Sequence, residues 1–186
     1  RLDFSADGKT LLSSGWDGRI GFWDVEPVDV VQVEIAAAVA KTEKEEAQPA
    51  VMQLQVTAAK MIEAHQGFSR WVHVAPDGKT IVTCGNDKLV KVWSAKKMKL
   101  RRYCAGHGRH PWAVMIHPNG EEMVSEDIMG EIIVWGLKDG KQRSKIDASV
   151  MTGFDLKFQA DMGGARAMAF NHDGTLLGCA GTTNVV

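Results

Sequence analysis

One pattern recurs along the chain and constrains its fold more than any other feature. Four segments align without gaps, and they begin at Leu2, Val72, Val114 and Met168. Each carries an Asp-Gly or Asn-Gly dipeptide, and these dipeptides are spaced by 70, 42 and 54 residues. Trp23, Trp93 and Trp135 repeat with the same spacings of 70 and 42 residues. Two markers that stay in register over three units indicate an internal structural repeat.

Each unit is predicted to be antiparallel β-structure. Alternating apolar residues flank every dipeptide, and a tight hairpin turn needs the positive φ that Gly and Asn tolerate. A third apolar run ends at each tryptophan, and a fourth strand is predicted over residues 100–104. Four short strands in a period of about 42 residues are typical of a propeller blade. We therefore predict an all-β β-propeller of four-stranded antiparallel blades, with about three and a half blades in repeat cores 2–25, 72–95, 114–137 and 168–186.

These units resemble WD repeats. Trp23-Asp24 matches the Trp-Asp pair that ends such a repeat, whereas Trp93 and Trp135 are followed by Ser and Gly. His65 and His107 each lie 12 residues before their turn residue, as in the Gly-His start of a WD repeat. The resemblance covers nearly the whole chain apart from two insertions. Because closed propellers have about four to eight blades, we expect the remaining blades of the same propeller to lie outside this sequence.

The resemblance also implies a structural brace inside each blade, a hydrogen-bonded set of His, Ser or Thr, Asp and Trp. In the second unit the matching residues are His65, Thr83, Asp87 and Trp93. The third unit has His107, Ser125 and Trp135, with Met129 in place of the aspartate. A buried member left without a partner costs about 1–3 kcal/mol, so we expect the complete set to stabilise its blade.

Two insertions interrupt the repeat, at about residues 26–55 and 147–164. In the first, apolar residues alternate on both sides of a charged segment, 41–46, as in a long hairpin. A helix over 35–47, or disorder, is an equal alternative because Ala, Lys and Glu favour helices. The second insertion contains Phe154 and Phe158. It precedes a first strand, so the resemblance places it around the central channel, as a binding loop or as a loop that buries its own rings.

Composition excludes several kinds of partner. With 22 basic and 23 acidic residues the formal charge is −1, so no global field attracts nucleic acid or an anionic membrane. No apolar run reaches the ~18 residues of a membrane-spanning helix. Lys96, Lys97, Lys99, Arg101 and Arg102 form a basic run, interpreted as a solvated blade edge or as a phosphate or acidic-protein contact. The acidic residues Glu121, Glu122, Glu126, Asp127 and Glu131 flank one hairpin and are expected to form a solvated face.

The sequence contains no motif that indicates catalysis. A phosphate-binding Gly-rich loop, a Gly-x-Ser-x-Gly elbow and a His-Glu-x-x-His helix are all absent. His107, His110 and His117 are close in sequence but belong to different parts of the repeat, so we expect no metal site there. The three cysteines are too few and too scattered for a disulfide framework or a zinc knuckle. We expect no cofactor and no enzymatic activity.

Binding of other proteins is therefore the function that we expect. In WD-repeat proteins, partners dock on the top face, formed by the residues just before first strands and just before brace aspartates. By resemblance, the partner-binding candidates here are Arg70, Trp71, Arg109, Trp112, Arg166, Trp16 and Asn86. Trp and Arg often dominate binding energy, although Trp71 and Trp112 are also compatible with packing under loops. The alternatives are a propeller enzyme or small-ligand module with a site at the central channel, and an accessory module of a larger enzyme.

Overall fold

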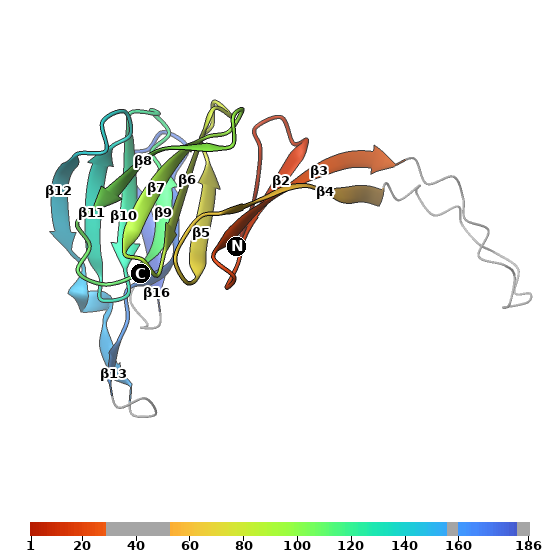
Figure 1. Ribbon diagram of the computed structural model, residues 1–186. Helices are drawn as coiled ribbons and strands as arrows, with labels where there is room; N and C mark the ends of the chain where they lie inside the picture. Colours follow the sequence, from red (N-terminus) through yellow and green to blue (C-terminus); the bar gives the residue numbers. More distant parts are fainter. Residues whose placement is uncertain (29–52, 156–159, 182–186) are drawn as a thin grey trace, which may run out of the picture.

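The computed structural model describes residues 1–28, 53–155 and 160–181, and these residues form strands, turns and one short 3-10 helix. Three four-stranded antiparallel sheets follow one another, and a two-stranded sheet follows them. The predicted fold class, three complete blades and part of a fourth, is confirmed (Figure 1). Blade 1 consists of β1 Leu2–Phe4, β2 Thr10–Ser14, β3 Arg19–Val28 and β4 Gln53–Glu63. Blade 2 consists of β5 Ser69–Val74, β6 Thr80–Gly85, β7 Leu89–Ser94 and β8 Lys99–Ala105.

Blade 3 repeats this order with β9 Pro111–Ile116, β10 Glu122–Asp127, β11 Glu131–Gly136 and β12 Gln142–Asp147. The partial blade 4 pairs β15 Ala165–Phe170 with β16 Leu177–Gly181. The repeated dipeptides form the turn between the first two strands of each blade, where Gly8, Gly78, Gly120 and Gly174 have φ of 70, 67, 70 and 76°. Because this left-handed region favours glycine, the dipeptides fix the position of each hairpin.

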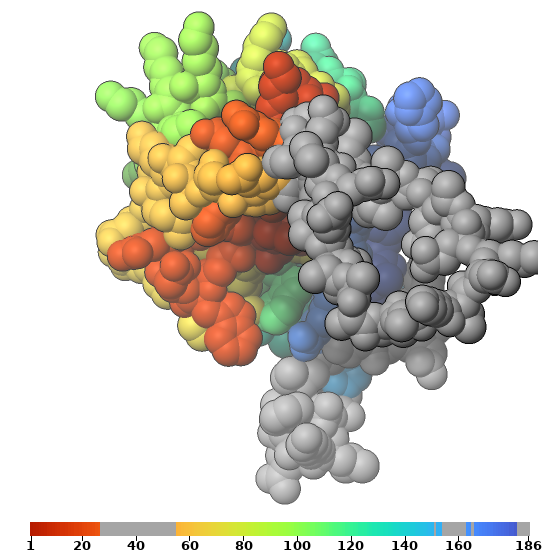
Figure 2. Space-filling model, turned by 90° about the vertical axis from the view of Figure 1, so that its right-hand side faces the viewer, coloured from red at the N-terminus to blue at the C-terminus, as the bar shows by residue number. Residues whose placement is uncertain are grey.

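The blades pack side by side through two apolar layers. Between blades 1 and 2 the core includes Phe22, Val72 and Trp93, and between blades 2 and 3 it includes Val92 and Trp135. First strands of successive blades are neighbours, β5 with β9 and β9 with β15. Figure 2 shows the molecule from the side of blade 1 that lies away from blade 2. Leu2 and Phe4 of β1 in this blade are 60% and 48% exposed. None of the described helices is long and apolar enough to cross a membrane.

Regular strands border both insertions. At the first, β3 and β4 form a long antiparallel ladder that extends to Val28 opposite Gln53 and projects away from the other blades (Figure 1). The predicted tip 41–46 and the alternative helix 35–47 lie outside the described residues. The second insertion contains the 3-10 helix Ser149–Met151 and a hairpin of β13 Gly153–Asp155 and β14 Ala160–Met162. Phe158 and the side chain of Phe154 lie outside the described part of the chain.

The acidic run does not form a solvated face as the sequence predicted. Glu121 is exposed, but Glu126 and Asp127 at the end of β10 are 0% and 2% exposed. Glu126 lies beside the Cys179 thiol of β16 and hydrogen-bonds with it. Asp127 faces His107 instead of water. The expectation was wrong because β10 is an inner strand of blade 3, covered by neighbouring blades on both sides.

Candidate functional site

A chain of hydrogen bonds crosses blade 2. Trp93 Nε1 donates to Thr83 Oγ1 over 2.9 Å, and His65 contacts Thr83 Oγ1 through Nε2 at 2.8 Å and Asp87 Oδ1 through Nδ1 at 2.7 Å. Since a carboxylate only accepts, Nδ1 carries the imidazole proton. The Thr83 hydroxyl then donates to Nε2 of the neutral ring. The four residues that the resemblance assigned to the brace therefore share one network, and each buried polar atom in it has a partner.

Asp87 carries a charge inside this network. Lys91 Nζ lies 2.8 Å from Asp87 Oδ2, and their side chains are 14% and 9% exposed. Burial alone would raise the pKa of Asp87, but the hydrogen bonds from His65 and Lys91 outweigh it and hold that pKa well below its ordinary value. Burial lowers the pKa of His65, which favours the neutral imidazole. The network thus holds an ionised aspartate and a neutral histidine at neutral pH.

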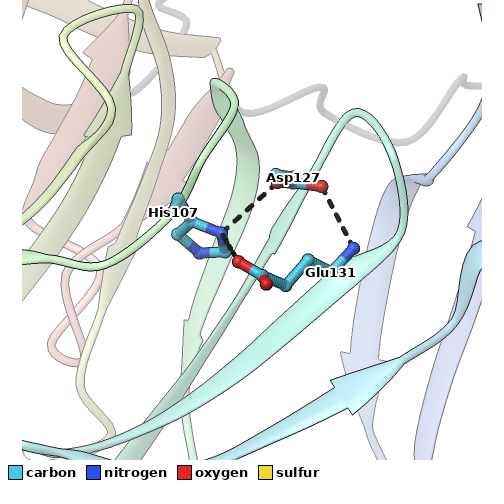
Figure 3. Close-up of side chains that lie close together, drawn as sticks. All are labelled: His107, Asp127 and Glu131. Carbon is cyan, nitrogen blue, oxygen red and sulfur yellow. Dashed lines mark hydrogen bonds and ion pairs between the residues drawn. The ribbon is translucent and has the colours of Figure 1, made fainter.

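Blade 3 contains a modified form of this network. Ser125 Oγ lies 2.6 Å from His107 Nε2 and accepts from Trp135 Nε1 at 2.7 Å. Met129 stands where blade 2 has its aspartate, and the carboxylates of Asp127 and Glu131 each lie 3.7 Å from His107 Nδ1 instead (Figure 3). In blade 1, Trp23 Nε1 donates to Ser13 Oγ at 2.8 Å, while Asp17 is exposed.

The cluster of His107, Asp127 and Glu131 has donor atoms that suit a divalent cation. One ligand atom from each lies within 4.8 Å of the others. However, Lys145 Nζ lies 2.9 Å from Glu131 Oε2 and supplies a positive charge there. The same histidine ring is also fixed by Ser125, as His65 is by Thr83. We therefore assign this cluster to the architecture of blade 3.

A second set of side chains lies where first strands begin, on the top face. Trp112 of β9 contacts a guanidinium group from each neighbouring blade. Cζ of Arg70 lies 4.2 Å from the Trp112 ring centroid, and Cζ of Arg166 lies 4.5 Å from it. The three residues occupy equivalent positions, since their spacings of 42 and 54 equal those of the turn dipeptides. Such cation–π contacts are worth about 0.5–1 kcal/mol each at exposed sites.

Two aromatic residues extend this arrangement toward blade 1. The ring centroid of Phe68 lies 5.7 Å from Arg70 Cζ. The same ring stacks on the Trp16 ring, with the two centroids 5.2 Å apart. Trp16 is 82% exposed. We call Trp16, Phe68, Arg70, Trp112 and Arg166 the Arg–Trp row. The sequence analysis missed Phe68, although its place two residues before Arg70 in a top-face segment was a usable signal.

Asn86 positions Arg70 in this row. Its Oδ1 accepts a hydrogen bond from Arg70 Nε at 2.6 Å, and its backbone N–H donates to the Phe68 carbonyl at 2.9 Å. Burial, and to a lesser extent the charge of Arg166, lowers the pKa of Arg70. Among the described residues, neither Arg70 nor Arg166 forms an ion pair with a carboxylate. The row therefore presents two guanidinium charges that the described part of the chain does not neutralise.

Besides Asn86, which contacts the row, two of the predicted partner-binding residues lie outside it. Trp71 is 4% exposed and packs in the core between blades 2 and 3, so the expectation that it faces a partner was wrong in this structure. A register irregularity between Ser69 and Trp71 accompanies this inward position. Arg109 is exposed in the β8–β9 connection, and no ring contact of it is observed within the described residues.

Comparison with known proteins agrees with this architecture. The WD40 family model, "WD domain, G-beta repeat", matches residues 1–24 and 57–94, which include strands of the first two blades. This match, together with the four-stranded antiparallel blades, supports a WD-repeat β-propeller family for this chain. WD-repeat proteins generally act as platforms for protein interactions.

Two curated WD-repeat relatives match roughly half of the chain. The small ribosomal subunit protein RACK1y of Oryza sativa subsp. japonica is 34% identical over 91 residues, which is 48% of this chain and 27% of that protein. The cross-pathway control WD-repeat protein 2 of Flammulina velutipes is 32% identical over 88 residues, which is 46% of this chain and 28% of that protein. The matches thus span about a quarter of the relatives' length.

A solved structure, the crystal structure of RRP9 WD40 repeats, shares the fold. It superposes with a TM-score of 0.58 at 15% identity, over 78% of this chain and 37% of that one. At this identity the likeness concerns the propeller architecture alone.

Proposed function

We propose that this WD-repeat chain is a non-catalytic platform that binds another protein through the Arg–Trp row of its top face. The observation that carries the proposal is the pair of guanidinium groups, Arg70 and Arg166, over the ring of Trp112. Trp and Arg are the side chains most often found at the energetic centre of a protein interface. The rigid blades hold them in place before any partner arrives, which reduces the entropy lost on binding.

The chemistry of the row supports binding by an acidic partner. Its two arginines have no carboxylate neighbour among the described residues. Stacking on Trp112 covers a face of each guanidinium group and leaves its N–H edges for acceptors, so carboxylates of a partner would complete the site. The row is made of Arg, Trp and Phe, which supply neither a nucleophile nor a group that titrates near neutral pH.

Quantitative affinity capture tests the proposal. The natural protein at its full length is compared with an Arg70→Ala/Trp112→Ala variant and with Trp16→Ala, each first shown to be folded. Tyr103→Ala is the matched control, because Tyr103 is also an exposed aromatic, 64% exposed, but lies on the outer strand β8. We expect specifically bound proteins to fall about tenfold or more for the double variant and to stay unchanged for Tyr103→Ala. Equal retention by the double variant and the wild type would contradict the proposal.

A further inference from the structure

A pocket of about 470 Å³ lies between blades 2 and 3. Its rim contains the β5–β6 turn of one blade and the β9–β10 turn of the next, around Asp77 and Asn119. These turns lie at the opposite ends of β5 and β9 from Arg70 and Trp112. The pocket is therefore separate from the Arg–Trp row. Its volume is in the range of about 300–1,000 Å³ that is usual for small-molecule sites.

Three cations line this pocket. Arg101 and Arg102 come from β8, and Lys138 follows β11 of the neighbouring blade. Asp77 supplies a carboxylate in the lining, and its Oδ1 accepts the Lys79 N–H at 2.9 Å. Within the described residues, none of the three cations forms an ion pair. The lining therefore has a positive excess.

Neutral groups hold the two arginines in place. Arg101 donates to Thr80 Oγ1 at 3.3 Å and to the Lys79 carbonyl at 3.5 Å. The stem of Arg102 lies against the β11–β12 turn, where a Cβ added to Gly140 would be 3.3 Å from Arg102 Cδ. Arg102 Nε is buried and has no hydrogen-bond partner among the described residues. A buried donor without an acceptor is costly, and Arg102 also belongs to the lining of the pocket.

Apart from Thr80 and Asn119, the rest of the lining is mostly apolar. Ala75, Val92 and Leu137 are 3%, 1% and 8% exposed, and two prolines complete this side. A ligand that fills the pocket thus meets positive charge at one part of its surface and apolar carbon at another. Bidentate guanidinium contacts suit the oxygens of a phosphate group, and three cations suit its second negative charge better than they suit a monoanion.

We propose that the pocket between blades 2 and 3 binds an organic phosphate, with the phosphate group on Arg101, Arg102 and Lys138 and a compact apolar group on Val92 and Leu137. The basic run that the sequence analysis interpreted as a solvated edge or as a phosphate contact thereby divides into two parts. Arg101 and Arg102 line the site, and the lysines before them do not. This site does not depend on the function proposed for the top face.

Isothermal titration calorimetry tests this proposal. The affinities of the natural protein for phenyl phosphate, benzoate and inorganic phosphate are measured at fixed ionic strength. Phenyl phosphate is expected to bind tightest, because it alone carries both a dianion and an apolar ring. Arg101→Gln and Lys138→Gln each remove one lining cation and are expected to weaken phenyl phosphate binding about tenfold. Lys97→Gln, a fold-neutral control on an exposed residue outside the lining, is expected to bind like the wild type.

The comparison separates the possible outcomes. Absence of binding, benzoate binding as tightly as phenyl phosphate, or equal weakening by Lys97→Gln and Lys138→Gln would overturn the proposal. Binding that is lost only in the lining variants supports it.

A second experiment uses vesicles with and without a phosphorylated inositol lipid. Retention on the phosphorylated vesicles alone identifies the ligand as a lipid headgroup, whereas binding of phenyl phosphate without vesicle retention identifies a soluble ligand.

Discussion

Replacement of Asp87 by Asn tests how much the blade 2 network stabilises the fold. Asp87 accepts a hydrogen bond from His65 at 2.7 Å and one from Lys91 at 2.8 Å, and its side chain is 9% exposed. The substitution removes the charge and turns an N–H₂ group toward one of these donors. Hydrogen bonds to charged groups are worth about 1.5–3 kcal/mol each, and part of one is retained, so we expect a loss of about 2–4 kcal/mol.

Asp17→Asn is the matched control for this experiment. Asp17 occupies the equivalent turn position, 70 residues earlier, but is exposed and accepts only the Arg19 N–H, at 3.0 Å, among the described contacts. Its substitution is expected to cost about 0.5 kcal/mol or less. Urea unfolding followed by tryptophan fluorescence measures both free energies of unfolding. If the two variants lose the same stability, the argument that the buried network stabilises blade 2 is refuted.

Three further predictions follow from burial and close contacts. Acid is expected to lower the urea midpoint between about pH 7 and pH 3, because Asp87 and His65 both have native pKa values below their unfolded ones. The stability that each group contributes is complete above its unfolded pKa and declines as the pH falls. A urea midpoint that rises on acidification would contradict this. Burial raises the pKa of the Cys84 thiol beyond its ordinary range and that of Cys179 to about 11. Cys84 is fully buried and Cys179 is not, so mass spectrometry after thiol labelling should find Cys179 modified first, and equal labelling rates would count against the packing described. Gly85→Ala is expected to destabilise the fold by about 1–3 kcal/mol, since its Cβ would lie 2.5 Å from the His65 ring and 2.6 Å from a backbone carbonyl, and an unchanged thermal midpoint would refute this.

The blades could be predicted from the sequence because their signals are local. Each hairpin turn contains a glycine such as Gly78, whose φ of 67° lies in the left-handed region that favours glycine. Each tryptophan such as Trp93 ends a short apolar run, and the spacing between the two markers survives every insertion. The hydrogen-bonded set of blade 2 was predictable from the resemblance to WD repeats, because this blade has a matching residue at each of the four positions.

The details of the candidate sites depend on contacts between blades, which one repeat does not encode. Trp71 and Trp112 differ by one position in strand phase, and only Trp112 contacts the arginines on both sides. Buried Glu126 lies beside Cys179 of the next blade, a contact that no single repeat specifies. The pocket likewise has a lining from two blades, with Arg102 from blade 2 and Lys138 from blade 3.

Site-specific photo-cross-linking tests the central claim, that the Arg–Trp row contacts a protein partner, most directly. A photoreactive phenylalanine analogue replaces Trp16 in the natural protein, and in a second variant it replaces Tyr103; both positions are exposed. We predict that position 16 cross-links a defined set of proteins, that these cross-links are lost when Arg70→Ala and Arg166→Ala are added, and that position 103 does not capture this set. The same proteins captured equally from position 103, or cross-links from position 16 that persist without the two arginines, would contradict the claim.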